Sequence, residues 1–357
     1  MKETSFINAW RELSEHAIVA NPFYDPDFCL PAIDALAKGT VWLAVVYDAA
    51  GLLIAAAPIS VSRVALVGPK TAYIWTHDYI PLGTPLVRQG YPYALNELLS
   101  GISAEYDAPV LCNLFKGTDR FDISAGDLKV EELTSFERAA MVTSLSGEEY
   151  RKITLSKQRR QGLNRRYRKL AEQTADLGPL CLEVCSDPDA VPNHFETFLR
   201  VEKLGWKGSK RSALLNEKSH ADFAREAAVR LSRRDAFVVA TLKAGDTILA
   251  ALTLLKVQDE YFSWKTSYDE SFADCSPGSQ MLARFSDELM GQGEEIILDS
   301  CAAPDNTLAN AIWSERVEVK DLLFAHSSQR AAGLAVCNMI NLHREAKQTV
   351  KRLIKRV

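Results

Sequence analysis

Apolar segments of strand length, separated by short polar turns, organise the second half of the chain. Residues 236–243, 247–257 and 261–268 are rich in β-branched and aromatic side chains, and a tight turn follows each of the first two segments. This pattern predicts an antiparallel meander of three strands. Apolar residues at helical spacing predict an amphipathic helix over residues 279–291, and the apolar run at 295–300 predicts a buried strand.

The first half of the chain has the same order of elements. Residues 40–48, 52–64 and 71–76 are predicted strands, 91–103 a helix, and 109–115 a buried strand. The segment GLLIAAAPISV in this half also resembles DTILAALTLLKV in the second half. An internal duplication explains both observations, so the sequence predicts two similar lobes.

Composition and charge support two units with different surfaces. The chain has 357 residues, of which 47% are hydrophobic and 25% charged, as in soluble globular proteins. The net charge of −4 divides into −9 for residues 1–150 and +5 for the remainder. We therefore predict an N-terminal domain over 1–150, a second domain over 151–330, and a basic helix over 331–357.

Several classes of protein are not expected. Because no apolar run approaches the length that spans a bilayer, the sequence predicts no integral membrane segment. The N-terminus MKETSFINAW lacks the pattern of a secretory signal, which favours a cytoplasmic location. The seven cysteines are irregularly spaced without a CxxC pair, and the six histidines do not cluster, so no metal site is expected.

A strongly basic segment joins the two predicted domains. Residues 151–170 contain nine Lys or Arg and no acidic residue. Such a helix can contact phosphates, but Tyr167 is its one aromatic residue, and bases need aromatic rings to stack on. A solvated face, or contact with an anionic sugar, lipid or protein, is the alternative; nucleic acid is not the expected partner.

The second half carries a set of residues in a characteristic order between the predicted strands. They are Ser156-Lys157-Gln158-Arg159-Arg160, Glu202, Trp206-Lys207-Gly208, Ala250, Tyr268-Asp269, Ser276-Pro277-Gly278 and Asp299. In this order they resemble the GNAT superfamily of acyl-CoA-dependent N-acyltransferases, and more narrowly its two-lobed CelD-like and Fem-like branches. The resemblance implies an α/β fold of tandem GNAT-like lobes, each a mixed, mostly antiparallel sheet flanked by helices, with the second lobe active.

The resemblance also implies a place for an acyl-CoA donor, acetyl-CoA in the first instance. The third meander strand, which contains Lys265, would splay from the next strand and bind the pantetheine arm along its open edge. The start of the following helix would hold the pyrophosphate on Ser276, Pro277, Gly278, Ser279 and Gln280. The alternative is an ordinary Pro-Gly helix start with a serine cap, and the loop contains less glycine than is typical of the superfamily.

Acyl transfer to an amine also needs proton transfer and an acceptor pocket. Among the residues that carry the resemblance, Tyr268 would protonate the leaving thiolate, and Asp299 and Glu202 are the candidate carboxylates. Trp206, Lys207 and Asp269 would bind the acceptor, a small molecule such as an amino sugar or other amine. The alternatives are structural: caps or strand ends for the acidic residues, and a core tryptophan beside a lysine that reaches solvent.

Two other functions remain open from the sequence. A Fem-like transferase would take its acyl group from aminoacyl-tRNA, which is the one case in which nucleic acid would be a partner. A GNAT fold without catalytic activity would act as a binding protein, and the glycine-poor loop is what that alternative expects. The oligomeric state and the identity of the acceptor do not follow from the sequence.

Overall fold

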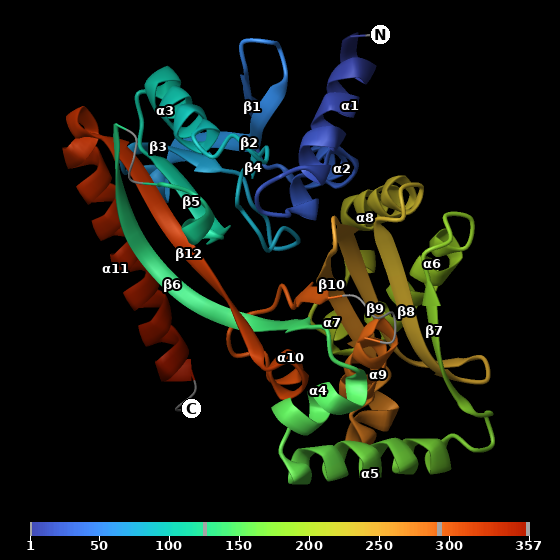
Figure 1. Cartoon of the computed structure of the whole chain (residues 1–357). Coiled ribbons are helices and arrows are strands. Elements are labelled where there is room, and N and C mark those ends of the chain that lie inside the picture. Colours follow the sequence, from blue (N-terminus) through green and yellow to red (C-terminus); the bar gives the residue numbers. More distant parts are fainter. Residues whose placement is uncertain (1, 124–126, 291–294, 355–357) are drawn as a thin grey trace. The chain divides into compact units, whose positions relative to one another are not determined.

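The computed structural model describes residues 2–123, 127–290 and 295–354, and it divides the chain into two compact units (Figure 1). Unit 1 comprises Met1–Pro26, Lys38–Phe136 and Glu318–Val357, and unit 2 comprises Asp27–Ala37 and Glu137–Val317. The predicted division at residues 150 and 330 differs from these bounds because two strands and a helix cross between the halves of the sequence.

Unit 1 contains a mixed sheet in the order β1-β2-β3-β5-β12, with β4 paired to β2. The three strands β1, β2 and β3 form an antiparallel meander, and β5 lies parallel to β3. The elements are α1 (Lys2–Glu15), β1 (Trp42–Tyr47), β2 (Leu53–Arg63), β3 (Lys70–Ile74), β4 (Leu86–Val87), α3 (Ala94–Tyr106), β5 (Val110–Lys116) and α11 (Arg330–Ile354).

Unit 2 repeats this arrangement in the strand order β6-β11-β10-β9-β8-β7. Here β8, β9 and β10 form the antiparallel meander, and β11 lies parallel to β10. The elements are α4 (Gly147–Thr154), α5 (Lys157–Gln173), β7 (Leu180–Cys185), α6 (Val191–Leu204), α7 (Trp206–Ser209), α8 (Lys218–Ser232), β8 (Phe237–Ala244), β9 (Thr247–Val257), β10 (Glu260–Tyr268), α9 (Pro277–Met290), β11 (Ile296–Asp299) and α10 (Thr307–Ile312). The predicted α/β fold of two similar lobes with mixed sheets is confirmed.

The last strand of each half pairs with the sheet of the other half. β6 (Leu128–Thr143) follows β5 in the sequence, but its end lies antiparallel to β11 in unit 2. β12 (Glu315–His326) follows β11, but it lies antiparallel to β5 in unit 1. This exchange explains why compact units and sequence halves have different bounds.

The sheet of unit 2 is covered on both faces. Helix α9 packs on one face of β8 and β9, and α6 and α8 pack on the other (Figure 1). Alternate residues of a strand point to opposite faces, so β8 contributes Val238 to the α9 side, while Phe237 meets Phe195 of α6 at 5.4 Å. Because both faces are buried, the strand is almost continuously apolar.

Helix α2 (Pro26–Leu36) leaves the N-terminal region and packs in unit 2. Its Phe28 makes edge contacts with Phe223 at 5.3 Å and Trp264 at 5.5 Å, and Asp27 pairs with Arg234 at 3.1 Å. An aromatic cluster beneath α6 and α8 therefore explains why this helix belongs to unit 2.

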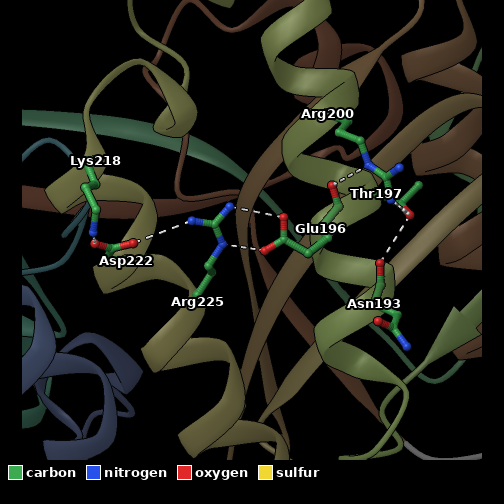
Figure 2. A network of polar contacts seen from close by, with 7 residues as sticks. All are labelled: Asn193, Glu196, Thr197, Arg200, Lys218, Asp222 and Arg225. Atoms are coloured by element: carbon green, nitrogen blue, oxygen red, sulfur yellow. Dashed lines mark hydrogen bonds and ion pairs between the residues drawn. The ribbon is translucent and has the colours of Figure 1, made fainter.

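A surface network joins α6 to α8. Arg225 of α8 forms two hydrogen bonds with the carboxylate of Glu196 on α6, and Asp222 lies 3.5 Å from the same guanidinium (Figure 2). The hydrogen bond from Arg225 holds the pKa of Glu196 below its usual value. The network joins the two helices that precede the meander, one of which, α6, carries Glu202.

Candidate active site

An opening between two parallel strands defines the site. β10 pairs with β11 only from Glu260 to Phe262, and β11 ends at Asp299, whereas β10 continues to Tyr268. The register of β10 against β9 shifts between Ser263 and Lys265, which is a β-bulge where the pairing with β11 stops. The later half of β10 therefore runs past the end of β11, as the predicted splay requires.

A cavity of about 480 Å³ fills this opening, large enough for part of a cofactor or a small substrate. Its walls come from β10, from the segment after β11, and from α7, α9 and α10. The lining residues are Lys207, Ser263, Trp264, Lys265, Thr266, Ser267, Tyr268, Leu282, Ser300, Cys301, Ala302, Asp305, Asn306, Thr307, Leu308, Ala309 and Trp313.

Two lysines of the cavity wall share a buried carboxylate. Glu202 is fully buried, and its Oε1 lies 2.9 Å from Lys265 Nζ and 3.5 Å from Lys207 Nζ. Its Oε2 accepts a hydrogen bond from the Leu214 amide at 2.8 Å. Lys207 also donates to the carbonyl of Thr266 on β10 at 2.8 Å. Burial, together with the charge of Lys265, lowers the pKa of Lys207, although Glu202 opposes the shift.

Glu202 has hydrogen-bond partners that bear on its expected role. Its carboxylate already accepts hydrogen bonds on both oxygens, and it is absent from the described lining of the cavity, where Lys207 and Lys265 stand. A carboxylate with these partners stabilises and orients the two ammonium groups. A catalytic role for Glu202 stays a prediction, and the structure places its carboxylate against the two lysines of the cavity wall.

Asp299 is likewise held by structural partners. Both of its oxygens face the guanidinium of Arg138, at 2.7 Å and 2.8 Å, and the Cys301 amide donates to Oδ1 at 2.9 Å. Asp299 and Arg138 are 1% and 2% exposed. Asp299, a predicted catalytic carboxylate, is not among the described lining residues of the cavity, whereas the next residues, Ser300 and Cys301, are.

The proposed pyrophosphate loop forms the start of α9. Pro277, Gly278 and Gln280 are buried, whereas Ser276 and Ser279 are partly exposed. A Cβ atom at Gly278 would lie 3.3 Å from Tyr268 Cδ1 and 3.5 Å from Leu308 Cδ1. Gly278 therefore permits close packing of these two cavity residues, and the surface open to a ligand lies at the two serines.

Basic helix α5 packs beside this loop. Arg166 donates to Ser276 Oγ at 3.3 Å, and Lys169 forms an ion pair with Asp274. Gln280 donates from its side chain to the Leu163 carbonyl at 3.0 Å, which ties α9 to the same helix. Part of the basic segment is thus fixed against the loop, and several cations on its outer side remain exposed, namely Lys157, Arg159, Arg165 and Arg168.

Three further predicted residues have different settings. Tyr268 lines the cavity at the end of β10. Asp269 accepts hydrogen bonds from the Ser271 amide and hydroxyl at 2.9 Å and 2.7 Å, as a cap would. The Trp206 side chain lies outside the described part of the structure.

The sequence analysis missed Asp305, the one carboxylate among the described lining residues. A signal was present: the carboxyl ends of parallel strands meet at one edge of a sheet, so the polar loop after β11 had to lie near the end of β10. Arg138 was also missed, because it comes from the far half of the sequence.

The sequence itself matches a known family in this region. Residues 157–299 match the family model of the acetyltransferase (GNAT) domain. Residues 157–299 are a GNAT domain. The match begins in α5 and ends at Asp299, so the GNAT domain spans the basic helix, the meander and the open edge of β10. This fold supports an acyltransferase type of function.

Solved structures extend the likeness of fold beyond the GNAT domain. FemX is 9% identical, with a TM-score of 0.59, over 92% of this chain and 98% of its own. The C-terminal DUF2156 domain of a predicted lysylphosphatidylglycerol synthetase from Agrobacterium fabrum is 13% identical, with a TM-score of 0.55, over 93% and 95%. A conserved protein of unknown function from Bacteroides thetaiotaomicron is 11% identical, with a TM-score of 0.54, over 90% and 97%. A search of curated proteins finds no match.

Neither a membrane-spanning helix nor a metal-binding cluster occurs among the described residues. Among residues 2–123, 127–290 and 295–354, no helix has both the length and the apolar character needed to cross a bilayer. The same part of the chain contains no group of three or more His, Cys, Asp or Glu residues able to hold a metal ion.

Proposed function

We propose that this protein is an N-acyltransferase that moves an acyl group, in the first instance acetyl, from acyl-CoA to the amine of a small-molecule acceptor. The observation that carries the proposal is the cavity along β10, where this strand runs past the end of β11 inside the GNAT domain. An exposed strand edge can pair with the amide groups of an extended ligand, as the pantetheine arm of coenzyme A is.

The donor phosphates would lie at the start of α9. Ser276 and Ser279 are the partly exposed residues there, and the first amides of a helix of 14 residues favour an anion. Arg166, which donates to Ser276, adds positive charge beside this position, whereas the charge of Lys169 is balanced by Asp274. The basic helix α5 would thus contribute positive charge for binding the phosphates, next to a loop that contains little glycine.

Tyr268 is the proposed acid. The acceptor nitrogen forms a bond to the thioester carbonyl carbon and loses a proton to water, the C–S bond then breaks, and water returns a proton to Tyr268 after the reaction. The departing thiolate takes a proton, which the hydroxyl of Tyr268 can supply because this residue ends β10 and lines the cavity. Glu202 keeps Lys207 and Lys265 in place, with the positive charge of the two lysines facing the same cavity.

Donor binding is the most direct test. We expect acetyl-CoA to raise the melting temperature of the purified protein, because a ligand that binds only the folded state stabilises it. Incubation with acetyl-CoA and mixed amines, including amino sugars, should then release free thiol with an acylated amine in the mass spectrum. Absence of stabilisation by acetyl-CoA and by longer acyl-CoAs would contradict the proposal and favour a catalytically silent binding protein.

The exposed cations of α5 favour a second candidate function, a transferase that depends on tRNA. A Fem-like transferase would bring its acyl group on tRNA, and Lys157, Arg159, Arg165 and Arg168 form a basic surface next to the loop of α9. The same thermal experiment separates the two donors. Stabilisation by charged tRNA and not by acyl-CoA would select the tRNA-dependent reaction, with a strong dependence on salt.

A further inference from the structure

A second cavity lies within unit 1. Its volume is about 490 Å³, and its described walls come from the start of β6, the end of β12 and the first turns of α11. All of these segments belong to unit 1, whereas the cavity along β10 belongs to unit 2. This second cavity is large enough for a small-molecule ligand, and it lies outside the GNAT domain of residues 157–299.

The floor of the unit 1 cavity is apolar. Leu323 and Ala325 of β12 line it and are 1% and 8% exposed. Gly333 of α11 leaves space beside them, because a Cβ atom there would lie 3.4 Å from Ala325 Cβ and 3.9 Å from Leu323 Cδ2. Leu334, at the edge of the cavity, is 51% exposed. A ligand with an apolar body would remove this surface from water, which favours binding.

The rim of the same cavity is charged. Lys129 of β6 and Arg330 of α11 line it from two different elements, and both are exposed. Within the part of the chain that the structure describes, neither side chain forms an ion pair. Glu131 is the single acidic residue of the described lining. Two cations thus stand against one carboxylate, which gives the rim a positive potential that attracts an anion.

We infer that unit 1 binds an amphiphilic anion, a single alkyl chain that ends in a carboxylate. The chain lies on the apolar floor at Leu323, Ala325 and Gly333, and the carboxylate lies at Arg330 and Lys129. The planar guanidinium of arginine matches a carboxylate with two parallel hydrogen bonds. The volume is near the lower end for small-molecule sites, which favours one chain of medium length over a lipid with two chains. This inference goes beyond the proposed function and does not depend on it.

A series of chain lengths tests the apolar floor and the charged rim together. Binding to the purified protein would be measured calorimetrically for the carboxylates from butanoate to decanoate, each below its micelle concentration. We expect a single site, with an affinity that rises about fourfold for each added methylene until the cavity is filled. Octylamine and octanol test the head group, and octanoate should bind at least about tenfold more tightly than either.

Gly333→Leu tests the floor. Its side chain would extend into the cavity, while its Cβ atom meets Ala325 at an ordinary contact distance, so octanoate binding should be lost with the fold retained. Gly333→Ala is a milder second variant, which should weaken octanoate without lowering the melting temperature, because alanine favours a helix over glycine. Gly101→Leu, in α3 of the same unit, is the control, since a Cβ atom there has nothing within 4 Å. It should leave octanoate binding unchanged.

The charged residues of the rim should act in opposite directions. Arg330→Gln and Lys129→Gln should each weaken octanoate and leave octanol unchanged. Glu131→Gln should strengthen octanoate, because it removes the one negative charge of the described lining. Lys38→Gln and Arg120→Gln remove exposed cations of unit 1 that are outside the described lining, and they should leave octanoate binding unchanged.

Several results would overturn the inference. They are absence of carboxylate binding, an affinity that does not rise with chain length, and equal affinities for octanoate and octylamine. Unchanged octanoate binding in both Gly333 variants, or many ligands bound to each chain, would show adsorption to the surface instead of a site. None of these titrations measures acyl transfer from acyl-CoA, so failure of the proposed function would leave their outcomes unchanged.

Discussion

Units 1 and 2 contain the same arrangement of strands, yet the space beside their parallel strands is open in unit 2 and filled in unit 1. In unit 2, β10 passes the end of β11, and a cavity lies beside it. In unit 1, β3 pairs with β5 only at Ala72 and Tyr73, and β5 continues to Lys116. The later part of β5 is not left open, because the chain after β3 returns to it.

The returning segment fills the place that the cavity has in unit 2. Gly83 donates its amide to the Leu114 carbonyl at 3.0 Å, and the Thr84 hydroxyl bonds both the amide and the carbonyl of Lys116 at 2.7 Å and 3.1 Å. Asn21 in turn donates to the Thr84 carbonyl at 2.8 Å. A duplicated fold has thus kept one site that can admit a ligand and one that its own backbone occupies.

The largest expected difference between the units is in the stability contributed by the ion pairs of the two exchanged strands, β6 and β12. In unit 2 the Arg138–Asp299 pair is almost fully buried, so Arg138→Met would leave a carboxylate in the core without its cation. We expect this variant to lose about 3–5 kcal/mol of unfolding free energy. In unit 1, Arg344 pairs with Asp321 at 2.6 Å, but the two side chains are 30% and 13% exposed.

Arg344→Met is therefore the matched variant, and it should cost less. Asp321 keeps the bonds it accepts from the Leu114 amide and the Thr134 hydroxyl, both at 2.9 Å. Urea unfolding of the two variants measures the difference. Equal losses would mean that burial of the pair does not distinguish the two units.

Gly83→Val would break the filled site of unit 1. A Cβ atom at Gly83 would lie 2.1 Å from the carbonyl oxygen of Asn113, which is backbone and cannot rotate away. Overpacking of this kind typically costs about 1–3 kcal/mol, so the melting temperature should fall clearly. Gly101→Val is the control, because a Cβ atom there has nothing within 4 Å. Equal stability of the two variants would show that segment 80–84 is not tightly packed against β5.

Gly278→Val tests the open site of unit 2 in the same way. The added methyl groups would meet Tyr268 and Leu308, both of which line the cavity, and push them into it. We expect binding of acyl-CoA to weaken about tenfold, or roughly 1.4 kcal/mol, with the fold retained. Gly101→Val, in the counterpart helix α3, should leave donor binding unchanged. Unaltered affinity in a folded Gly278→Val protein would reject the proposed donor site.

The sequence predicted the repeated core because that part depends on local pattern. Apolar periodicity and turns predict the strands 247–257 and 261–268 and the helix that corresponds to α9. The structure has these elements with ends that differ by a few residues at most. The exchange of β6 and β12, and the transfer of α2 to unit 2, could not be predicted. They depend on contacts between residues far apart in the sequence, such as Phe28 with Trp264.

The candidate site shows the same limit. Lys207, Lys265 and Tyr268 were predicted as site residues, and the structure brings all three to one cavity. The sequence gives no sign that Asp299 has Arg138 as its partner, because Arg138 lies on a strand from the other half of the chain. It also gives no sign that Glu202 lies behind two lysines, since the register of α6 against β10 decides which groups meet.

The smallest expected effect concerns the reactivity of Lys207, and it compares the two units through their lysines. Because burial lowers its pKa, Lys207 should react with acetic anhydride at lower pH than exposed Lys129 of unit 1. Lys265→Met removes a neighbouring positive charge and should move the labelling midpoint up; Glu202→Gln removes the opposing carboxylate and should move it down. Since one pKa unit is a tenfold change in the neutral fraction, mass spectrometry across a pH series resolves even a fraction of a unit. If both substitutions move the midpoint in the same direction, Lys207 is not coupled to these two groups, and the open site of unit 2 owes its charge to something other than this cluster.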